Sequence, residues 1–244
     1  MPHKTSRRRL LALMPAAVAA LGVAAACGSA ATPAPKTANE QQAPAKPADQ
    51  KPADAKPTIA PAAAAPKPAA KSMAGPPPLT IDPNKKYTAS IKTSMGEMTA
   101  ELYAKDAPNT VNNFVFLSKE GFYNGVIFHR VIKEFMIQTG DPQGTGMGGP
   151  GYKFNDELSS PHKYEKGTLA MANAGPNTQG SQFFICHGPG AERLPKNYTI
   201  FGKVTDGMDA LDKIAGVPVK PGGNGENSSP VEPPKIETVQ IGEA

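Results

Sequence analysis

The residues best suited to chemistry lie in one stretch, 128–141, which has the sequence FHRVIKEFMIQTGD. It combines one cation, Arg130, and one amide, Gln138, with the apolar side chains of Phe135 and Met136. A single strong donor beside an apolar surface suits an uncharged peptide segment. The usual groups for breaking a covalent bond are missing from the stretch. We therefore expect it to rotate a bond and not to cleave one.

Metal-ligating residues are few. The two cysteines, Cys27 and Cys186, lie in segments of different composition, and the four histidines are scattered. A zinc site needs three or four converging ligands, and two distant cysteines do not make a disulfide framework. We predict no bound metal and no cofactor, and we expect Cys186 to be a buried, inert thiol.

A glycine-rich segment, 141–152, contains one G-x-G-x-x-G pattern, which begins at Gly144. This pattern indicates dinucleotide binding only where a helix opens on it. Pro150 and Gly151 follow immediately and disfavour such a helix. We therefore predict a loop and reject a nucleotide site.

Composition divides the chain near residue 78. Residues 1–78 carry a formal charge of +7 and hold 14 of the 27 prolines, whereas residues 79–244 carry −2. The net charge of +5 thus comes from the N-terminal part and is poor support for nucleic-acid binding. The 166 residues after the boundary are enough for one well-buried domain.

Residues 1–27 are typical of an export signal, with a cationic start, an apolar run over residues 10–26, and Cys27 at its end. The segment VAAACG around this cysteine resembles a bacterial lipobox, which implies cleavage and a lipid anchor on Cys27. An ordinary signal peptide with an incidental cysteine is the alternative. Arginines 7–9 also resemble a twin-arginine signal, so that route and general secretion both stay open. Either route delivers the domain outside the cytoplasm, on the cell membrane or envelope.

Residues 28–78 are rich in Ala, Pro and Lys, with almost no branched or aromatic residues. Such a segment cannot bury enough apolar surface to offset its chain entropy. We predict a disordered tether whose extended polyproline stretches reach on the order of 100 Å. A tether of this length also suits a spacer or adhesin, which is a weaker alternative function for the whole protein.

Hydrophobic periodicity predicts many short strands and two helices in residues 79–244. We expect strands at 87–92, 97–103, 126–131, 135–139, 168–172, 181–186, 198–204 and 236–241. We expect one helix from a cap at Asp106 to Gly121, a second after a cap at Asp206, and a polar loop beyond it. This pattern predicts a mainly β fold, a closed antiparallel barrel with helices over its ends.

Four segments of this domain resemble the cyclophilins, the cyclophilin-type peptidyl-prolyl cis-trans isomerases. They are FHRVIKEFMIQTGD, GTGMGG, LAMANAGPNTQGSQFFIC and YTIFGKV, and the resemblance covers residues 87–241 in order. It implies a closed eight-stranded antiparallel β-barrel capped by two helices. It also implies isomerase activity on Xaa-Pro peptide bonds, with unfolded or exported proteins as partners and no nucleic acid.

The same resemblance implies roles for individual residues. Arg130 matches the catalytic arginine of the family, and Gln138 and Gln182 match polar groups that act with it or hold the peptide backbone. The implied substrate-binding residues are Phe135, Met136, Ala172, Asn173, Phe184, Leu194 and Tyr198, with His129 and Gly144 at the margin of the groove. Two positions depart from the family: Tyr198 replaces a common histidine, and Arg193 replaces a tryptophan that contacts cyclosporin.

Taken singly, each of these residues has a simpler explanation. Phe135, Met136 and Phe184 could be core residues, and Arg130 could pair with a surface carboxylate. Only their occurrence together favours a monomeric enzyme in which Arg130 donates to the prolyl nitrogen within an apolar pocket. A groove that binds proline-containing segments without catalysis is the alternative, and the substitutions at 193 and 198 leave it open.

Overall fold

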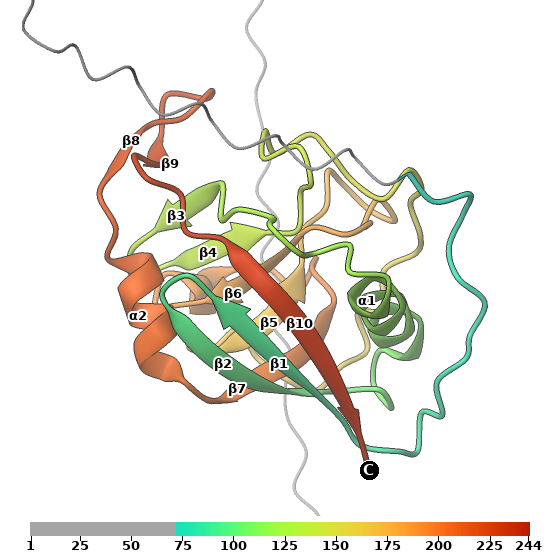
Figure 1. The fold of residues 1–244 in the computed structure, drawn as a ribbon. Helices are drawn as coiled ribbons and strands as arrows, with labels where there is room; N and C mark the ends of the chain where they lie inside the picture. Colours follow the sequence, from blue (N-terminus) through green and yellow to red (C-terminus); the bar gives the residue numbers. More distant parts are fainter. Residues whose placement is uncertain (1–71) are drawn as a thin grey trace, which may run out of the picture. The chain divides into compact units, whose positions relative to one another are not determined.

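A curled antiparallel sheet of eight strands organises residues 72–244, the part of the chain described by the structure, a computed structural model (Figure 1). Its strands are β1 (Tyr87–Thr93), β2 (Gly96–Leu102), β3 (Arg130–Ile132), β4 (Met136–Thr139), β5 (Thr168–Met171), β6 (Phe183–Cys186), β7 (Ile200–Asp206) and β10 (Ile236–Glu243). Their order across the sheet is β10-β1-β2-β7-β5-β6-β4-β3. The predictions for Cys27, the export signal and nearly all of the tether lie outside the described residues.

The sheet stops short of the closed barrel that we predicted. Strands β3 and β10 are its two edges. The segments that precede them are linked by an isolated bridge between Ile127 and Lys235 and by backbone hydrogen bonds that join Ile236 to Gly125 and Val126. The Phe128 amide donates to the Pro234 carbonyl at 2.8 Å, but Pro233 and Pro234 have no N–H with which to continue a ladder. The fold is therefore a curled half-barrel.

Two α-helices, α1 (Pro108–Lys119) and α2 (Met208–Ala215), lie at separate places around the sheet (Figure 1). The buried stripe of α1 includes Val111, Phe114 and Leu117, as its periodicity predicts. Rings of Phe114 and Phe183 meet edge-on at 5.5 Å, so α1 packs on the core face of the sheet. A short 3-10 helix, η1 (Ala191–Arg193), precedes β7.

Both predicted helix caps are wrong. Ala107 is the N-cap of α1, and the carboxylate of Glu157 accepts from the N–H groups of Asn109 and Thr110 at 3.1 and 2.8 Å. Asp106 instead contacts the His162 ring. Gly207, in the left-handed region at φ 83°, begins α2 because β7 extends through the residue that we assigned as its cap.

The polar loop that we predicted after α2 contains a hairpin. Strands β8 (Val219–Pro221) and β9 (Asn227–Pro230) form a separate two-stranded sheet, which lies beside β3 (Figure 1). The N–H of Gly222 donates to the carbonyl of Glu226 at 2.7 Å and closes the turn between them. This hairpin brings a C-terminal segment next to the stretch that carries Arg130.

Residues just before the domain boundary also contact the folded part. The Met73 amide donates to the Pro150 carbonyl at 2.7 Å, and the Asn112 side chain donates to the Pro78 carbonyl at 2.9 Å. Residues 72–244 include no helix long and apolar enough to cross a membrane.

Candidate active site

Strand register aligns three of the candidate residues side by side across the sheet. Arg130 on β3 is directly opposite Gln138 on β4, and Gln138 is opposite Phe184 on β6. Directly opposed residues point to the same face of a sheet. The adjacent row contains Ile137 and Ile185, which are fully buried in the core. Alternation along three short strands thus separates the functional face from the core face.

This functional face contains a pocket of about 140 Å³. Nine of the predicted site residues line it, namely Arg130, Phe135, Met136, Gln138, Ala172, Asn173, Phe184, Leu194 and Tyr198. Its volume is smaller than that of a typical small-molecule site, which is roughly 300–1,000 Å³. The pocket therefore suits a single side chain of a longer ligand.

Four of these residues form an apolar wall, which we define as Phe135, Met136, Phe184 and Leu194. Met136 and Phe184 are buried, and the Phe184 ring meets the Tyr198 ring edge-on at 5.5 Å. Packing holds this wall in place, because its residues also belong to a small hydrophobic cluster of their own.

Tyr164 supports the wall from behind, and sequence reasoning missed it. Its hydroxyl donates to the Tyr198 carbonyl at 2.8 Å and accepts from the Tyr198 amide at 3.1 Å. The hydroxyl therefore fixes both backbone groups of Tyr198. The tyrosine lies outside the recognised motifs, in a segment without regular periodicity.

Beside the wall is a set of hydrogen-bonded polar side chains, the polar row, which we define as Gln182, Gln138 and Arg130. The Gln182 amide nitrogen donates to the carbonyls of Gly146 and Gly148, at 3.0 and 2.8 Å. Its oxygen must then face Gln138, whose nitrogen donates to it at 3.0 Å. The Gln138 oxygen is left to accept from Nη1 of Arg130 at 3.5 Å. Each amide thus turns its acceptor toward the arginine.

Asp141 holds the glycine-rich loop on which the polar row depends. Its carboxylate accepts from the N–H groups of Gln143, Thr145 and Gly146 at 2.7, 2.8 and 2.6 Å. Burial raises the pKa of Asp141, but these backbone donors, together with Gly148, outweigh burial and lower the pKa below its usual value. Asp141 is therefore charged at neutral pH and holds the loop whose carbonyls orient Gln182.

His129 and Gly144, predicted at the groove margin, do not line the pocket. Gly144 is in the left-handed region at φ 66°, and a side chain there would collide with Ile127. Both ring nitrogens of His129 are buried and have no hydrogen-bond partner among the described residues. Burial lowers the pKa of His129, so the ring is neutral at pH 7. Gly144 is part of the glycine-rich loop, and the His129 ring lies next to Gly146 of the same loop.

A larger hollow of about 640 Å³ continues from the pocket along the glycine-rich loop. It shares Gln138, Ala172 and Asn173 with the pocket, and Gln182 lines it. The side chain of Asn173 is engaged with the Asn197 carbonyl at 2.8 Å, which leaves its main chain to meet a ligand. Pocket and hollow together form a groove that suits an extended peptide.

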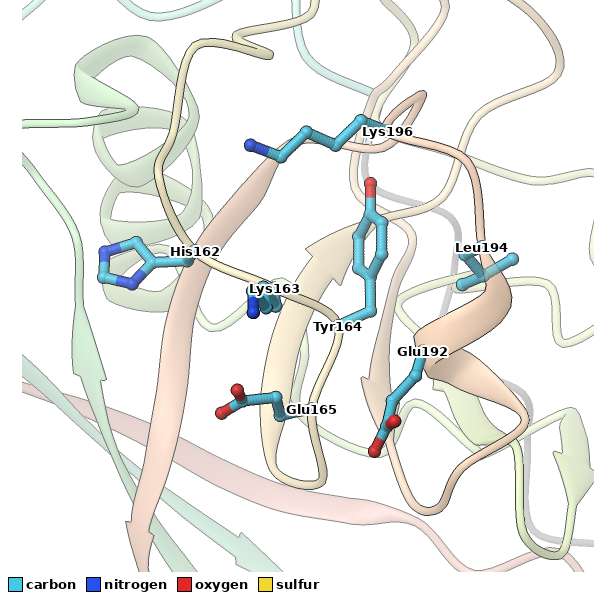
Figure 2. Close-up of a pocket in the computed structure, with 7 residues that line it drawn as sticks. All are labelled: His162, Lys163, Tyr164, Glu165, Glu192, Leu194 and Lys196. Carbon is cyan, nitrogen blue, oxygen red and sulfur yellow. The ribbon is translucent and has the colours of Figure 1, made fainter.

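A separate hollow of about 540 Å³ adjoins the other side of Leu194. Figure 2 shows the carboxylates of Glu165 and Glu192 toward one end of it and Lys196 with the Tyr164 hydroxyl toward the other. Burying a proline ring among such groups would remove their hydration without replacing it. The small pocket that the apolar wall lines therefore suits a proline ring better.

Sequence reasoning also missed the partner of Arg130. Nε of Arg130 donates to Oε2 of Glu226 at 3.0 Å, and Nη2 lies 2.9 Å from the same oxygen in an ion pair. The guanidinium carbon also lies 6.0 Å from the centre of the Phe135 ring, within cation–π range. Glu226 is separated from Arg130 by 96 residues and lies in a glycine-rich turn, so no local pattern connects the two.

Other chemistry finds little support in residues 72–244. No group of three or more His, Cys, Asp or Glu residues in this range could hold a metal ion. Cys186 is fully buried, and burial raises its pKa to about 12, so it stays a thiol and not a nucleophilic thiolate. The prediction of a buried thiol is confirmed.

Comparison with known proteins gives a consistent result. Residues 88–241 match the family model described as cyclophilin type peptidyl-prolyl cis-trans isomerase. A peptidyl-prolyl cis-trans isomerase from Helicobacter pylori is 50% identical over 133 residues, which are 53% of this chain and 81% of the relative. A peptidyl-prolyl cis-trans isomerase-like 3 from Gallus gallus is 48% identical over 134 residues, 53% of this chain and 83% of its own.

Solved structures agree with these relatives. A cyclophilin-type peptidyl-prolyl cis-trans isomerase from Cryptosporidium parvum is 36% identical, with a TM-score of 0.59 over 64% of this chain and 98% of that one. A structure of the same enzyme in the presence of the dipeptide Ala-Pro is 38% identical, with a TM-score of 0.58 and the same coverage.

Proposed function

Since this chain belongs to the cyclophilin-type peptidyl-prolyl cis-trans isomerases, and is an isomerase, we propose that Arg130 performs its reaction by donating to the prolyl nitrogen. The substrates that we propose are Xaa-Pro bonds of exported proteins. The observation that carries the mechanism is the pocket in which this guanidinium faces an apolar wall.

The barrier to be lowered is electronic. An amide nitrogen shares its lone pair with the carbonyl, which gives a rotation barrier of roughly 18–20 kcal/mol. Uncatalysed exchange before proline therefore takes about 10–100 s. When the bond twists, the sharing ends, the nitrogen becomes basic, and the carbonyl becomes less polar. A catalyst must prefer this twisted state to both planar states.

Arg130 has the required preference. A resonant prolyl nitrogen accepts hydrogen bonds poorly, whereas the twisted nitrogen has a localised lone pair, so a donor there stabilises mainly the transition state. Nη1 of Arg130 lies near Gln138 and Met136, which both line the pocket. The donor therefore faces the place where we put the proline ring.

The apolar wall acts in the same direction. Low polarity around the ring strengthens a charged hydrogen bond. It also favours the less polar carbonyl of the twisted state. The hollow along the glycine-rich loop would hold the residues that precede proline, and the Ala-Pro dipeptide present with the Cryptosporidium enzyme is consistent with a substrate of this class.

The location of this enzyme is part of the proposal and depends on the sequence. The export signal, the lipobox-like segment at Cys27 and the long tether favour an isomerase anchored to the cell envelope. Its substrates would then be proteins that fold after export. Labelling cells with a radioactive fatty acid should mark the wild-type protein and leave Cys27→Ser unlabelled.

A protease-coupled assay on an Ala-Pro peptide tests the mechanism with the full chain. We expect Arg130→Ala to lower kcat/KM by about 10²–10³-fold, the loss typical of one transition-state donor. Affinity for a proline-containing peptide, measured by calorimetry, should change less than about threefold, because the planar prolyl nitrogen of the bound peptide accepts poorly from Arg130. Equal losses of activity and affinity would favour the non-catalytic binding module.

Arg193→Ala is the matched control. Arg193 is an exposed arginine beside Leu194, outside the pocket, so its removal changes the charge at the rim without changing the donor. Its kcat/KM should stay near the wild-type value. A loss as large as that of Arg130→Ala would mean that net charge and not a positioned donor carries the activity.

A further inference from the structure

The β8–β9 hairpin adds a residue to the active site that lies outside the four recognised motifs. Glu226, in the turn of this hairpin, contacts the edge of the Arg130 guanidinium formed by Nε and Nη2. One carboxylate oxygen accepts from Nε at 3.0 Å and forms an ion pair with Nη2 at 2.9 Å. Nη1 points the other way, toward Gln138 and Met136. Glu226 thus holds one edge of the guanidinium, and Nη1 on the other edge lies next to residues that line the pocket.

The turn itself fixes Glu226. Its N–H donates to Oδ1 of Asn224 at 3.1 Å, and its carbonyl accepts from the Gly222 N–H at 2.7 Å. The Ser228 hydroxyl also donates to that carbonyl, at 3.4 Å, and Ser228 is buried. The carboxylate therefore projects from a hydrogen-bonded backbone and not from an unsupported surface loop.

Two effects of the pair oppose each other. The carboxylate reduces the net positive charge near the reacting nitrogen, which weakens the donor. It also removes the rotational freedom of a long side chain before substrate binds, which favours the reactive geometry. Glu226 is 38% exposed and Arg130 is 33% exposed, so solvent screens the carboxylate charge. Orientation depends on contact and is not screened in the same way.

We infer that Glu226 is a positioning residue, which fixes the guanidinium of Arg130 so that Nη1 meets the prolyl nitrogen of the twisted substrate. This inference rests on the proposed function, because it needs Arg130 to be the donor. It also gives the hairpin a role in the reaction. An exposed ion pair contributes little stability, at most about 1 kcal/mol, so the pair is better explained by geometry than by folding energy.

Glu226→Ala and Glu226→Gln separate position from charge. We expect Glu226→Ala to lower kcat about tenfold with little change in KM, since displacement of a catalytic group costs this much or more. Glu226→Gln keeps an oxygen acceptor for Arg130 and should return kcat to within about threefold of wild type. Glu232→Ala, which removes an exposed glutamate just after β9, is the matched control and should leave kcat unchanged.

A double-mutant cycle with Arg130→Ala decides between positioning and a merely structural role. If Glu226 acts through Arg130, adding Glu226→Ala to Arg130→Ala should change the remaining activity less than about twofold. A similar loss in both backgrounds, or a rise in kcat in Glu226→Ala alone, would overturn the inference. If Arg130→Ala itself retains full activity, the proposed function fails first, and the two failures are distinguishable.

Discussion

The two sides of the groove are built by different interactions. The apolar wall of Phe135, Met136, Phe184 and Leu194 is held by packing within a hydrophobic cluster. The polar row begins with two hydrogen bonds from Gln182 to the glycine-rich loop and continues through Gln138 to Arg130 as single hydrogen bonds. Contact area on the first side is shared among neighbours, whereas each link between side chains of the row occurs once.

This difference separates two tasks. A wall made of shared contacts binds the ring in every state of the reaction, and this uniform part of its contribution affects KM more than kcat. The low polarity of the wall adds a smaller preference for the twisted state. A row of directional hydrogen bonds fixes one donor, and its benefit is realised in the twisted state. Substitutions on the two sides should therefore produce different kinetic signatures.

Removing the more deeply buried ring of the wall gives the largest effect expected in this comparison. Phe184 is only 5% exposed, and Phe184→Ala should lower the free energy of unfolding by about 3 kcal/mol because it leaves a cavity. KM should rise more than kcat falls. Denaturant melts and the coupled assay measure these effects, and Phe184→Leu should restore most of both. If kcat fell without a rise in KM, the wall would act mainly on the transition state and our division would be wrong.

Cutting the polar row should show the opposite signature. Gln182→Ala removes the amide that orients Gln138, so we expect kcat to fall about tenfold, equivalent to about 1.4 kcal/mol, with little loss of stability. Gln240→Ala, an exposed glutamine on β10, is the control for side-chain truncation and should leave kcat unchanged. An increase in KM without a change in kcat would show that Gln182 only binds peptide.

The wall and the three members of the row were predictable from sequence. Arg130 and Gln138 lie on the paired strands of one short hairpin, where alternation puts their side chains on one face, and Phe135 lies in the turn between these strands. Phe184 lies in a second recognisable strand, and pairing of β4 with β6 brings it beside Gln138. Local periodicity and the family motifs therefore identify the same residues.

Contacts between distant segments were not predictable. Glu226, Tyr164 and Glu157 act through polar atoms of single side chains, and none lies in a segment with a helical or strand-like period. The failure to close the barrel depends on two prolines beside β10, whose effect appears only when the strand opposite is known. A carboxylate in a glycine-rich turn has no periodicity that would indicate its partner.

The stability of the loop behind the polar row should depend on pH through His129. Burial lowers its pKa from the ordinary 6.5, while the charge of Asp141 raises it and that of Arg130 lowers it. The unfolded chain takes up a proton near pH 6.5, and the folded protein resists it. The stabilising contribution is therefore complete above that pH and is lost as the pH falls toward and through the lower folded value.

His129→Phe keeps a ring and removes the titration. Denaturant melts at pH 7.5 and 5.0 should show that the wild-type protein loses more stability between these values than the variant does. The comparison between the two proteins cancels the contributions of the rest of the chain, which they share. Equal pH dependence in the two proteins would mean that the buried ring is protonated without penalty.

The smallest effect is expected at Tyr198, which could belong to either side of the groove. Its ring meets Phe184 edge-on, and its backbone is held by Tyr164, so both contacts survive when the hydroxyl is removed. If Tyr198 serves only as wall, Tyr198→Phe should change kcat and KM less than about twofold, since packing is conserved. The coupled assay on the Ala-Pro peptide checks this result, with Phe184→Leu as the reference for an altered wall. A clear fall in kcat would instead assign the Tyr198 hydroxyl to the polar side, because the substitution leaves the apolar ring in place and removes only a hydrogen-bonding group.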